Sequence, residues 1–139
     1  MLTFKLRPAT VIAAVVLAMV FAVPSSTALA SAKSCQQKAN TPFTTCSHVN
    51  GRGLHINYLQ GSVFNGGNRD ESGVHIQLTR PSGATIKNCR SATIGPLQTI
   101  RCTWSPHRNE PAGNYCATSW QRVGGSFIER GHACVRVTR

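Results

Sequence analysis

Acidic residues are scarce in this sequence. Only four of the 139 residues are aspartate or glutamate, against 15 lysines and arginines, and the formal net charge is +11. Asp70 is the only aspartate and no G-x-S-x-G segment occurs, so a Ser-His-Asp hydrolase is not indicated. The glycine-rich segments also lack the lysine and the helical context of a phosphate-binding loop.

Metal-ligand spacings are missing as well. The chain has no C-x-x-C and no H-x-x-x-H segment, and its nearest approach to a ligand cluster is His132 beside Cys134, with His107 following Cys102. We therefore expect neither a metal nor a cofactor. Lysines and arginines are scattered singly, which argues against a dedicated nucleic-acid patch.

The first thirty residues have the order of an export signal. Two basic residues precede an apolar run at residues 9–23, and small residues follow up to Ala30. This pattern predicts a signal peptide over residues 1–30, cleaved after Ala30, with Ala32 as the second choice. The alternative is an uncleaved membrane anchor, but the run is shorter than the roughly 20 residues that a spanning helix needs. We expect a secreted, extracellular protein.

The remaining chain, residues 31–139, suggests a single domain with a modest core. Without the two basic residues of the signal, 13 lysines and arginines stand against four acids, for a net charge of +9. Such an excess favours attraction to polyanions, such as nucleic acid, acidic wall polymers or anionic head groups. Simple solubility of a secreted protein is the alternative explanation.

All six cysteines follow the signal, and an even number in an exported chain indicates disulfides. Fifteen pairings are open, but each pair of neighbours flanks a turn signal. The turn residues are Asn40 and Pro42, Gly95 and Pro96, and Gly124 and Gly125. Residues at equal distances from a hairpin turn lie opposite each other, so we expect hairpin disulfides. They are Cys35–Cys46, Cys89–Cys102 and Cys116–Cys134.

Apolar and polar residues alternate over residues 54–59 and 74–79, the pattern of half-buried strands. Helical periodicity is absent, and residues 61–73 are rich enough in glycine and asparagine to predict a mobile loop. Seven or so short strands predict an all-β fold stapled by three local disulfides. The two architectures left open are a small antiparallel β-sandwich, immunoglobulin-like in shape, and a small barrel.

The segments GNYCATSW and ERGHACVRV, in a basic and cysteine-rich exported chain, resemble the small secreted cysteine-hairpin β-proteins of soil actinomycetes. The resemblance covers most of residues 31–139 and implies no activity. The same segment invites comparison with an immunoglobulin strand. However, Tyr115 is adjacent to Cys116 rather than two residues before it, and Tyr58 stands near the position of the expected tryptophan. An immunoglobulin pairing would also break the hairpin disulfides.

The two tryptophans are candidates for a binding surface. Trp104 shares a strand face with Cys102, and Trp120 shares one with Cys116. One interpretation is an aromatic platform for a sugar ring or a base. The other, which the sequence favours, is that both indoles pack against neighbouring disulfides in the core.

Arginines accompany Trp120 in the last predicted hairpin. Strand alternation puts Arg122 on the Trp120 face, and an unbroken register puts Arg130 opposite Trp120 and Arg136 on the Cys134 face. Together they would make a basic stripe beside the indole, where an arginine over the ring would contribute about 0.5–1 kcal/mol. The predicted binding residues are Trp120, Arg122, Arg130 and Arg136.

The five histidines show no spacing that indicates a catalytic pair, and isolated surface histidines are the favoured interpretation. Residues 105–113, SPHRNEPAG, are the nearest candidate for the braced loop of an inhibitor. The function expected from the sequence is a non-catalytic binding protein attracted to anionic polymers or cell surfaces. The alternatives are a small inhibitor or antimicrobial effector and, third, a small basic hydrolase such as a ribonuclease.

Overall fold

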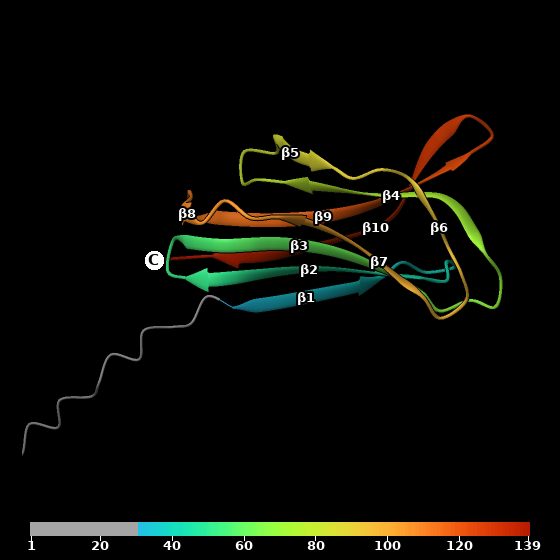
Figure 1. Ribbon diagram of the computed structural model, residues 1–139, viewed down its shortest axis with the longest axis horizontal. Coiled ribbons are helices and arrows are strands. Elements are labelled where there is room, and N and C mark those ends of the chain that lie inside the picture. Colours follow the sequence, from blue (N-terminus) through green and yellow to red (C-terminus); the bar gives the residue numbers. More distant parts are fainter. Residues whose placement is uncertain (1–30) are drawn as a thin grey trace, which may run out of the picture.

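The computed structural model describes residues 31–139, and the predicted signal peptide lies outside them. This part of the chain forms a sandwich of two antiparallel sheets, without a helix and without a closed barrel (Figure 1). The prediction of an all-β fold is confirmed, and the sandwich is the correct one of its two architectures. Within residues 31–139 there is no helix of the length and apolar character needed to cross a membrane.

The first sheet has the order β1-β2-β3-β7, with β8 beside β3, and the second has the order β10-β9-β4-β5, with β6 beside β4. The strands of the first sheet are β1 (Ala32–Gln37), β2 (Phe43–Arg52), β3 (His55–Asn65), β7 (Thr99–Trp104) and β8 (Arg108–Asn109). Those of the second are β4 (Glu71–Thr79), β5 (Thr85–Asn88), β6 (Ala92–Ile94), β9 (Gly113–Val123) and β10 (Ser126–Val137).

The period-two alternation decides which face of each strand is buried. On β4, Val74, Ile76 and Leu78 are fully buried in the core, and the intervening polar side chains face outward. Gly61 on β3 marks a close approach of the sheets. A Cβ at this position would lie 2.7 Å from Ile76 Cγ2 and 2.9 Å from Ala117 Cβ, so no side chain fits there.

The interior is polar where β2 faces β9 and β10. Thr45 Oγ1 and Ser119 Oγ are hydrogen-bonded at 2.7 Å, and Ser47 Oγ donates to the backbone oxygen of Tyr115 at 3.1 Å. A Cβ at Gly131 would clash with Thr45 Oγ1, so glycine is required on β10 here. We call these five residues the polar seam.

Tyr115 anchors the start of β9. Its ring is fully buried, and its hydroxyl donates to the backbone oxygen of Pro111 at 2.8 Å. A tyrosine bonded to backbone a few residues upstream also braces immunoglobulin-like sandwiches. Burial raises the pKa of Tyr115; nearby Glu110 adds to this effect, and Arg80 opposes it.

The three predicted disulfides are confirmed: Cys35–Cys46, Cys89–Cys102 and Cys116–Cys134. The first and third join paired strands, and in each of them the Cα atoms of the two cysteines are 4.0 Å apart. This distance is closer to the Cα spacing of about 4.5 Å at non-hydrogen-bonded sites than to the spacing of about 5.5 Å at hydrogen-bonded sites.

The hairpin geometry predicted for Cys89–Cys102 is wrong. Cys89 follows β5 and bonds through its N–H to Ile76 of the second sheet, whereas Cys102 lies on β7 of the first sheet. The disulfide therefore crosses the sandwich. The turn at Gly95 and Pro96 joins β6 to β7, which are not paired with each other, so Cys89 and Cys102 do not face each other across a hairpin.

The mobile loop predicted at residues 61–73 is also wrong. Most of this segment continues β3 and β4, and the connection between them is pinned by Asn65, which is fully buried. The Asn65 side-chain amide donates to the backbone oxygens of Arg69, Ile94 and Gly95, and its oxygen accepts from the N–H of Gly67. These bonds order the connection, although its composition is typical of loops.

Candidate functional site

The outer face of the second sheet carries rows of polar and aromatic side chains, which the strand register sets side by side. One row runs across β10, β9, β4 and β5, and the next row holds Trp120 between its neighbours on β10 and β4. The first row is His132, Thr118, Gln77 and Asn88; the second is Glu129, Trp120 and His75; the third pairs Phe127 with Arg122.

A shallow cleft of about 410 Å³ opens on this face. Its lining combines two aromatic rings and a histidine with amide, hydroxyl and disulfide groups. The lining residues are His75, Gln77, Asn88, Cys89, Ser91, Trp120 and Phe127. The indole of Trp120 is half-buried, and its Nε1 donates to Gln77 Oε1 at 3.3 Å. Trp120 is thus outside the core, and the packing interpretation that the sequence favoured is wrong for it.

Trp104 behaves as the packing interpretation predicted. It lies opposite Leu59 on the inner face of the first sheet, and it packs, partly buried, against the core. The two tryptophans therefore have different roles. Trp120 lines the cleft, whereas Trp104 packs against the core.

His75 forms one wall of the cleft, directly opposite Trp120 in the register. The ring of Phe127 stands edge-on to it, with centroids 4.9 Å apart and planes at 86°. The Nδ1 atom of His75 is shielded from solvent and has no hydrogen-bond partner within residues 31–139. Burial lowers the pKa of His75, which favours its neutral imidazole.

The predicted place of Arg130 is wrong. A β-bulge between Glu129 and Gly131 shifts the register, so Glu129 rather than Arg130 lies opposite Trp120. Arg130 turns away and donates through Nε to Gln121 Oε1 at 2.9 Å, while the amide of Gln121 donates to Glu71 Oε2 at 2.8 Å. Arg130 holds a partly buried chain of polar side chains together and is not part of a stripe beside the indole.

The other two predicted arginines are far apart. Arg122 pairs with Phe127 at the cleft and is exposed. Arg136 lies opposite Asn114, six residues along β9 from Trp120, a separation of roughly 20 Å at about 3.3 Å per residue. The predicted stripe is thus reduced at the cleft to Arg122. Sequence reasoning missed Arg90, which is exposed and stands between two cleft residues, Cys89 and Ser91.

The acidic side chains offset little of the charge on this face. Glu110 lies elsewhere, next to β8 of the first sheet, where it is 5% exposed and pairs with Arg108 through Nε and Oε1 at 2.7 Å. Glu129 is the one carboxylate beside Trp120; it lies across β9 from His75 and outside the cleft lining. Two exposed arginines thus flank the cleft without lining it, Arg90 by its place between Cys89 and Ser91 and Arg122 by its pairing with Phe127, and Glu129 is the acid next to the indole.

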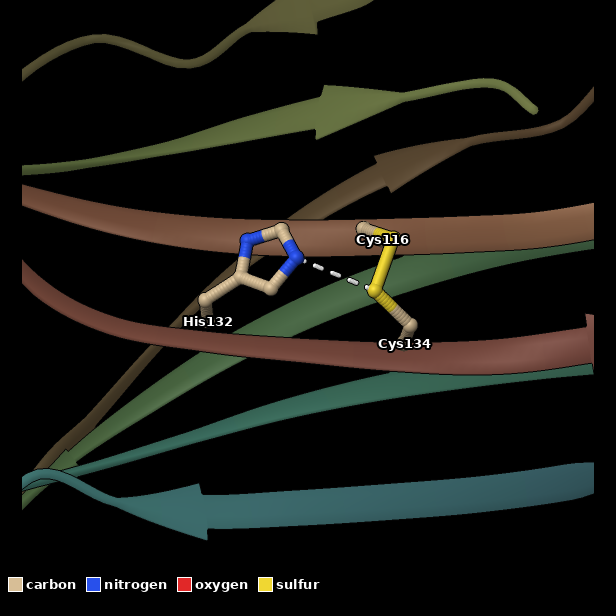
Figure 2. A group of neighbouring side chains, drawn as sticks. All are labelled: Cys116, His132 and Cys134. Atoms are coloured by element: carbon tan, nitrogen blue, oxygen red, sulfur yellow. Dashed lines mark hydrogen bonds between the residues drawn. A yellow bond between two sulfur atoms is a disulfide. The ribbon is translucent and has the colours of Figure 1, made fainter. Parts of the chain in front are cut away.

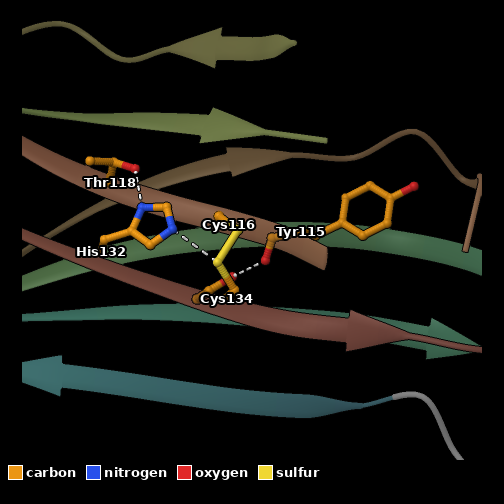
Figure 3. Close-up of a disulfide and its surroundings, with 6 residues drawn as sticks. Tyr115, Cys116, Thr118, His132 and Cys134 are labelled. Atoms are coloured by element: carbon orange, nitrogen blue, oxygen red, sulfur yellow. Dashed lines mark hydrogen bonds between the residues drawn. A yellow bond between two sulfur atoms is a disulfide. The ribbon is translucent and has the colours of Figure 1, made fainter. Parts of the chain in front are cut away.

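A second cluster on the same face joins His132 to the disulfide of Cys116 and Cys134 (Figure 2). Nε2 of His132 lies 3.1 Å from Sγ of Cys134, and Nδ1 is hydrogen-bonded to Thr118 Oγ1 at 2.8 Å (Figure 3). The spacing suits three metal ligands, but both sulfurs are in the disulfide and neither is a thiolate. In this oxidised form the cluster holds the imidazole in one orientation and is not a metal site.

Residues 105–113 are braced, as expected of an inhibitor loop, but not projected. Arg108 and Asn109 form β8 and pair with β3, and the N–H of Glu110 donates to the backbone oxygen of Leu54. The backbone of this segment is thus held on one side by β3, and the Arg108 side chain, although 64% exposed, is bound by Glu110.

Three of the histidines, which the sequence predicted to be isolated surface side chains, each contact a different neighbour. His48 stands edge-on to Tyr58 on the outer face of the first sheet, His75 lies against Phe127, and His132 lies against the disulfide. None of these contacts brings together the acid and base that a ribonuclease needs.

Most cleft residues were not predicted as site residues. The alternation on β4 had placed His75 and Gln77 on an outward face, and this was the available signal. Their position beside Trp120 depends on the pairing of β4 with β9, and the local sequence pattern does not predict which strands pair. No family model and no curated protein matches the chain.

Proposed function

We propose that this protein is a secreted, non-catalytic binding protein that attaches to anionic polymers through the outer face of its second sheet. The observation that carries the proposal is a cleft with an accessible indole, flanked by the exposed arginines Arg90 and Arg122. Arginine offers a planar fork that pairs with carboxylate or phosphate, and an indole adds a flat apolar surface beside it.

The disulfides support an extracellular setting. The six cysteines are paired and no cysteine of the described chain is free, an arrangement that persists in oxidising compartments and is rare in the cytosol. The expected signal peptide points in the same direction. A binding role suits a rigid, stapled sheet face, because little order has to be gained when the ligand attaches.

The test is retention on a heparin column, with residues 31–139 in the disulfide-bonded form. Replacing Arg90 and Arg122 with glutamine should move elution to clearly lower salt, since counterion release makes such binding steeply salt-dependent. The matched control replaces Lys33 and Arg101 with glutamine. Both are exposed on the outer face of the first sheet, so the control removes the same amount of charge from the opposite side.

The control should elute close to the native protein. Equal shifts in both double variants would show that net charge alone attracts the polymer, and would refute this face as the contact. A native protein that is not retained at low salt would refute the binding proposal itself. The inhibitor, antimicrobial and hydrolase alternatives would then be the ones to test.

A further inference from the structure

We propose that the cleft seats one sugar ring, with the ring's apolar face on Trp120, so that the anionic polymer is an acidic polysaccharide. This inference rests on the proposed function and adds the class of polymer to it. It separates a ligand with rings and hydroxyls from a polyanion that offers charge alone.

The size and composition of the cleft suit a single ring. Its volume of about 410 Å³ is near the lower end of the roughly 300–1,000 Å³ of small-molecule sites, which are mostly apolar with a few placed polar groups. The Gln77 side chain bonds the indole Nε1 and so holds the plane of Trp120 in place. A pyranose carries C–H groups on one face and hydroxyls around its rim, and this division matches a flat indole surrounded by polar side chains.

The rim offers both donors and acceptors. The side chains of Asn88 and Ser91 have no hydrogen-bond partner in the described part of the chain, and both line the cleft. An amide and a hydroxyl each donate and accept, as sugar hydroxyls do.

His75 adds an unsatisfied group to the wall. Its Nδ1 is buried without a hydrogen-bond partner in the described residues. The neighbouring ring of Phe127 is 53% exposed and lies near the projecting end of hairpin β9–β10 (Figure 1). Buried polar atoms are normally paired, so a ligand hydroxyl that reached Nδ1 would gain a hydrogen bond there.

The geometry favours a sugar over a nucleobase. His75 and Phe127 meet at 86°, so these two rings do not form a parallel pair that could enclose a planar base. It also favours binding over cleavage. No carboxylate lines the cleft, whereas glycoside hydrolysis typically needs two.

The experiment measures affinity by calorimetry for three probes at one ionic strength: hyaluronan oligosaccharides, polyphosphate and oligo(dT). Trp120→Ala should weaken hyaluronan binding by about tenfold or more, a loss of about 1.4 kcal/mol, and leave polyphosphate binding within about twofold. Phe64→Ala is the matched control, because Phe64 is an exposed aromatic (36%) on the opposite outer face, and it should change neither affinity.

Asn88→Ala provides a second variant that leaves the aromatic packing intact, and it should also weaken hyaluronan selectively. If hyaluronan and polyphosphate both bind and neither variant separates them, the sugar-ring inference is wrong while the proposed function stands. If oligo(dT) binds as tightly as hyaluronan and loses as much with Trp120→Ala, the occupant is a base and the inference is again wrong. If no probe binds the native protein, the proposed function fails first.

Discussion

The three disulfides should differ in what their removal costs, although chain entropy alone makes them nearly equal. Consider three variants, each with both cysteines of one pair replaced by alanine. The sequence separations are 11, 13 and 18 residues, and loop-closure entropy over such lengths gives about 3 kcal/mol for every pair.

The structure separates them by position. Cys102 is 1% exposed and belongs to the core cluster, and its disulfide is the one that crosses between the sheets. Cys46 and Cys116 lie on outer faces, where they join strands that backbone hydrogen bonds already hold in register. Removing the Cys102 sulfur also leaves a small core cavity, which adds about 1 kcal/mol. We therefore expect about 4 kcal/mol for the Cys89–Cys102 pair and about 3 kcal/mol for each of the others.

The assay is urea unfolding of the three variants, with non-reducing peptide mapping to establish that the two remaining disulfides are native. Urea unfolding reports the difference of about 1 kcal/mol directly, and a thermal scan of the same variants should show it as roughly 4 °C or more in melting temperature. A Cys116–Cys134 variant that loses as much stability as the Cys89–Cys102 variant would refute the argument from position. Recovery of a Cys46–Cys116 linkage from the native protein would refute the pairing itself.

Two further predictions concern the core and the cleft. Gly61→Ala should cost about 1–3 kcal/mol of stability, or about 4–12 °C in melting temperature, because its Cβ would press on Ile76 across the sheets. Gly66→Ala is the control. Its Cβ would have its nearest contact at 3.3 Å, on the exposed ring of Phe64, so the melting temperature should change far less. Burial lowers the pKa of His75, so the unfolded state binds its proton more readily. Its contribution to stability is fully present above the unfolded pKa of about 6.5 and is lost as pH falls below it, and His75→Gln should flatten the dependence of melting temperature on pH between 7.5 and 5. An unchanged slope would contradict the role assigned to His75.

The sequence was sufficient for the local features of the fold. Period two on β4 predicted its buried face, and the turn signals predicted all three cysteine pairs. In the last hairpin, Gly124 and Gly125 both have positive φ, 56° and 85°, as a two-residue type I′ turn requires. Val123 pairs with Ser126 across it.

The sequence itself contains a signal for the bulge at Arg130. Seven residues separate Cys116 from Gly124, but eight separate Gly125 from Cys134. If the turn and the disulfide both fix the register, one residue on the longer side must be left unpaired. Only a register without that extra residue would put Arg130 opposite the indole of Trp120.

The cleft could not be predicted in the same way. Its walls come from β4, β9, β10 and the segment after β5, and their order in the sheet is not sequential. Local periodicity shows which residues face outward, but it does not show which strands are neighbours. The sequence predicts Cys89 as a disulfide partner and Trp120 as a candidate binding residue. That both line the same cleft depends on a disulfide that crosses between the sheets, whereas the sequence predicted a disulfide within a hairpin.

The polar seam has a consequence for how stability depends on temperature. Unfolding exposes apolar surface, which raises the heat capacity, but it also exposes the hydroxyls and backbone that meet between β2 and β9, and polar exposure lowers it. An interior of mixed polarity therefore has a smaller heat-capacity increment than an equally large apolar one. The free energy of unfolding then curves less with temperature, so it falls less on either side of its maximum than it would for an equally large apolar interior.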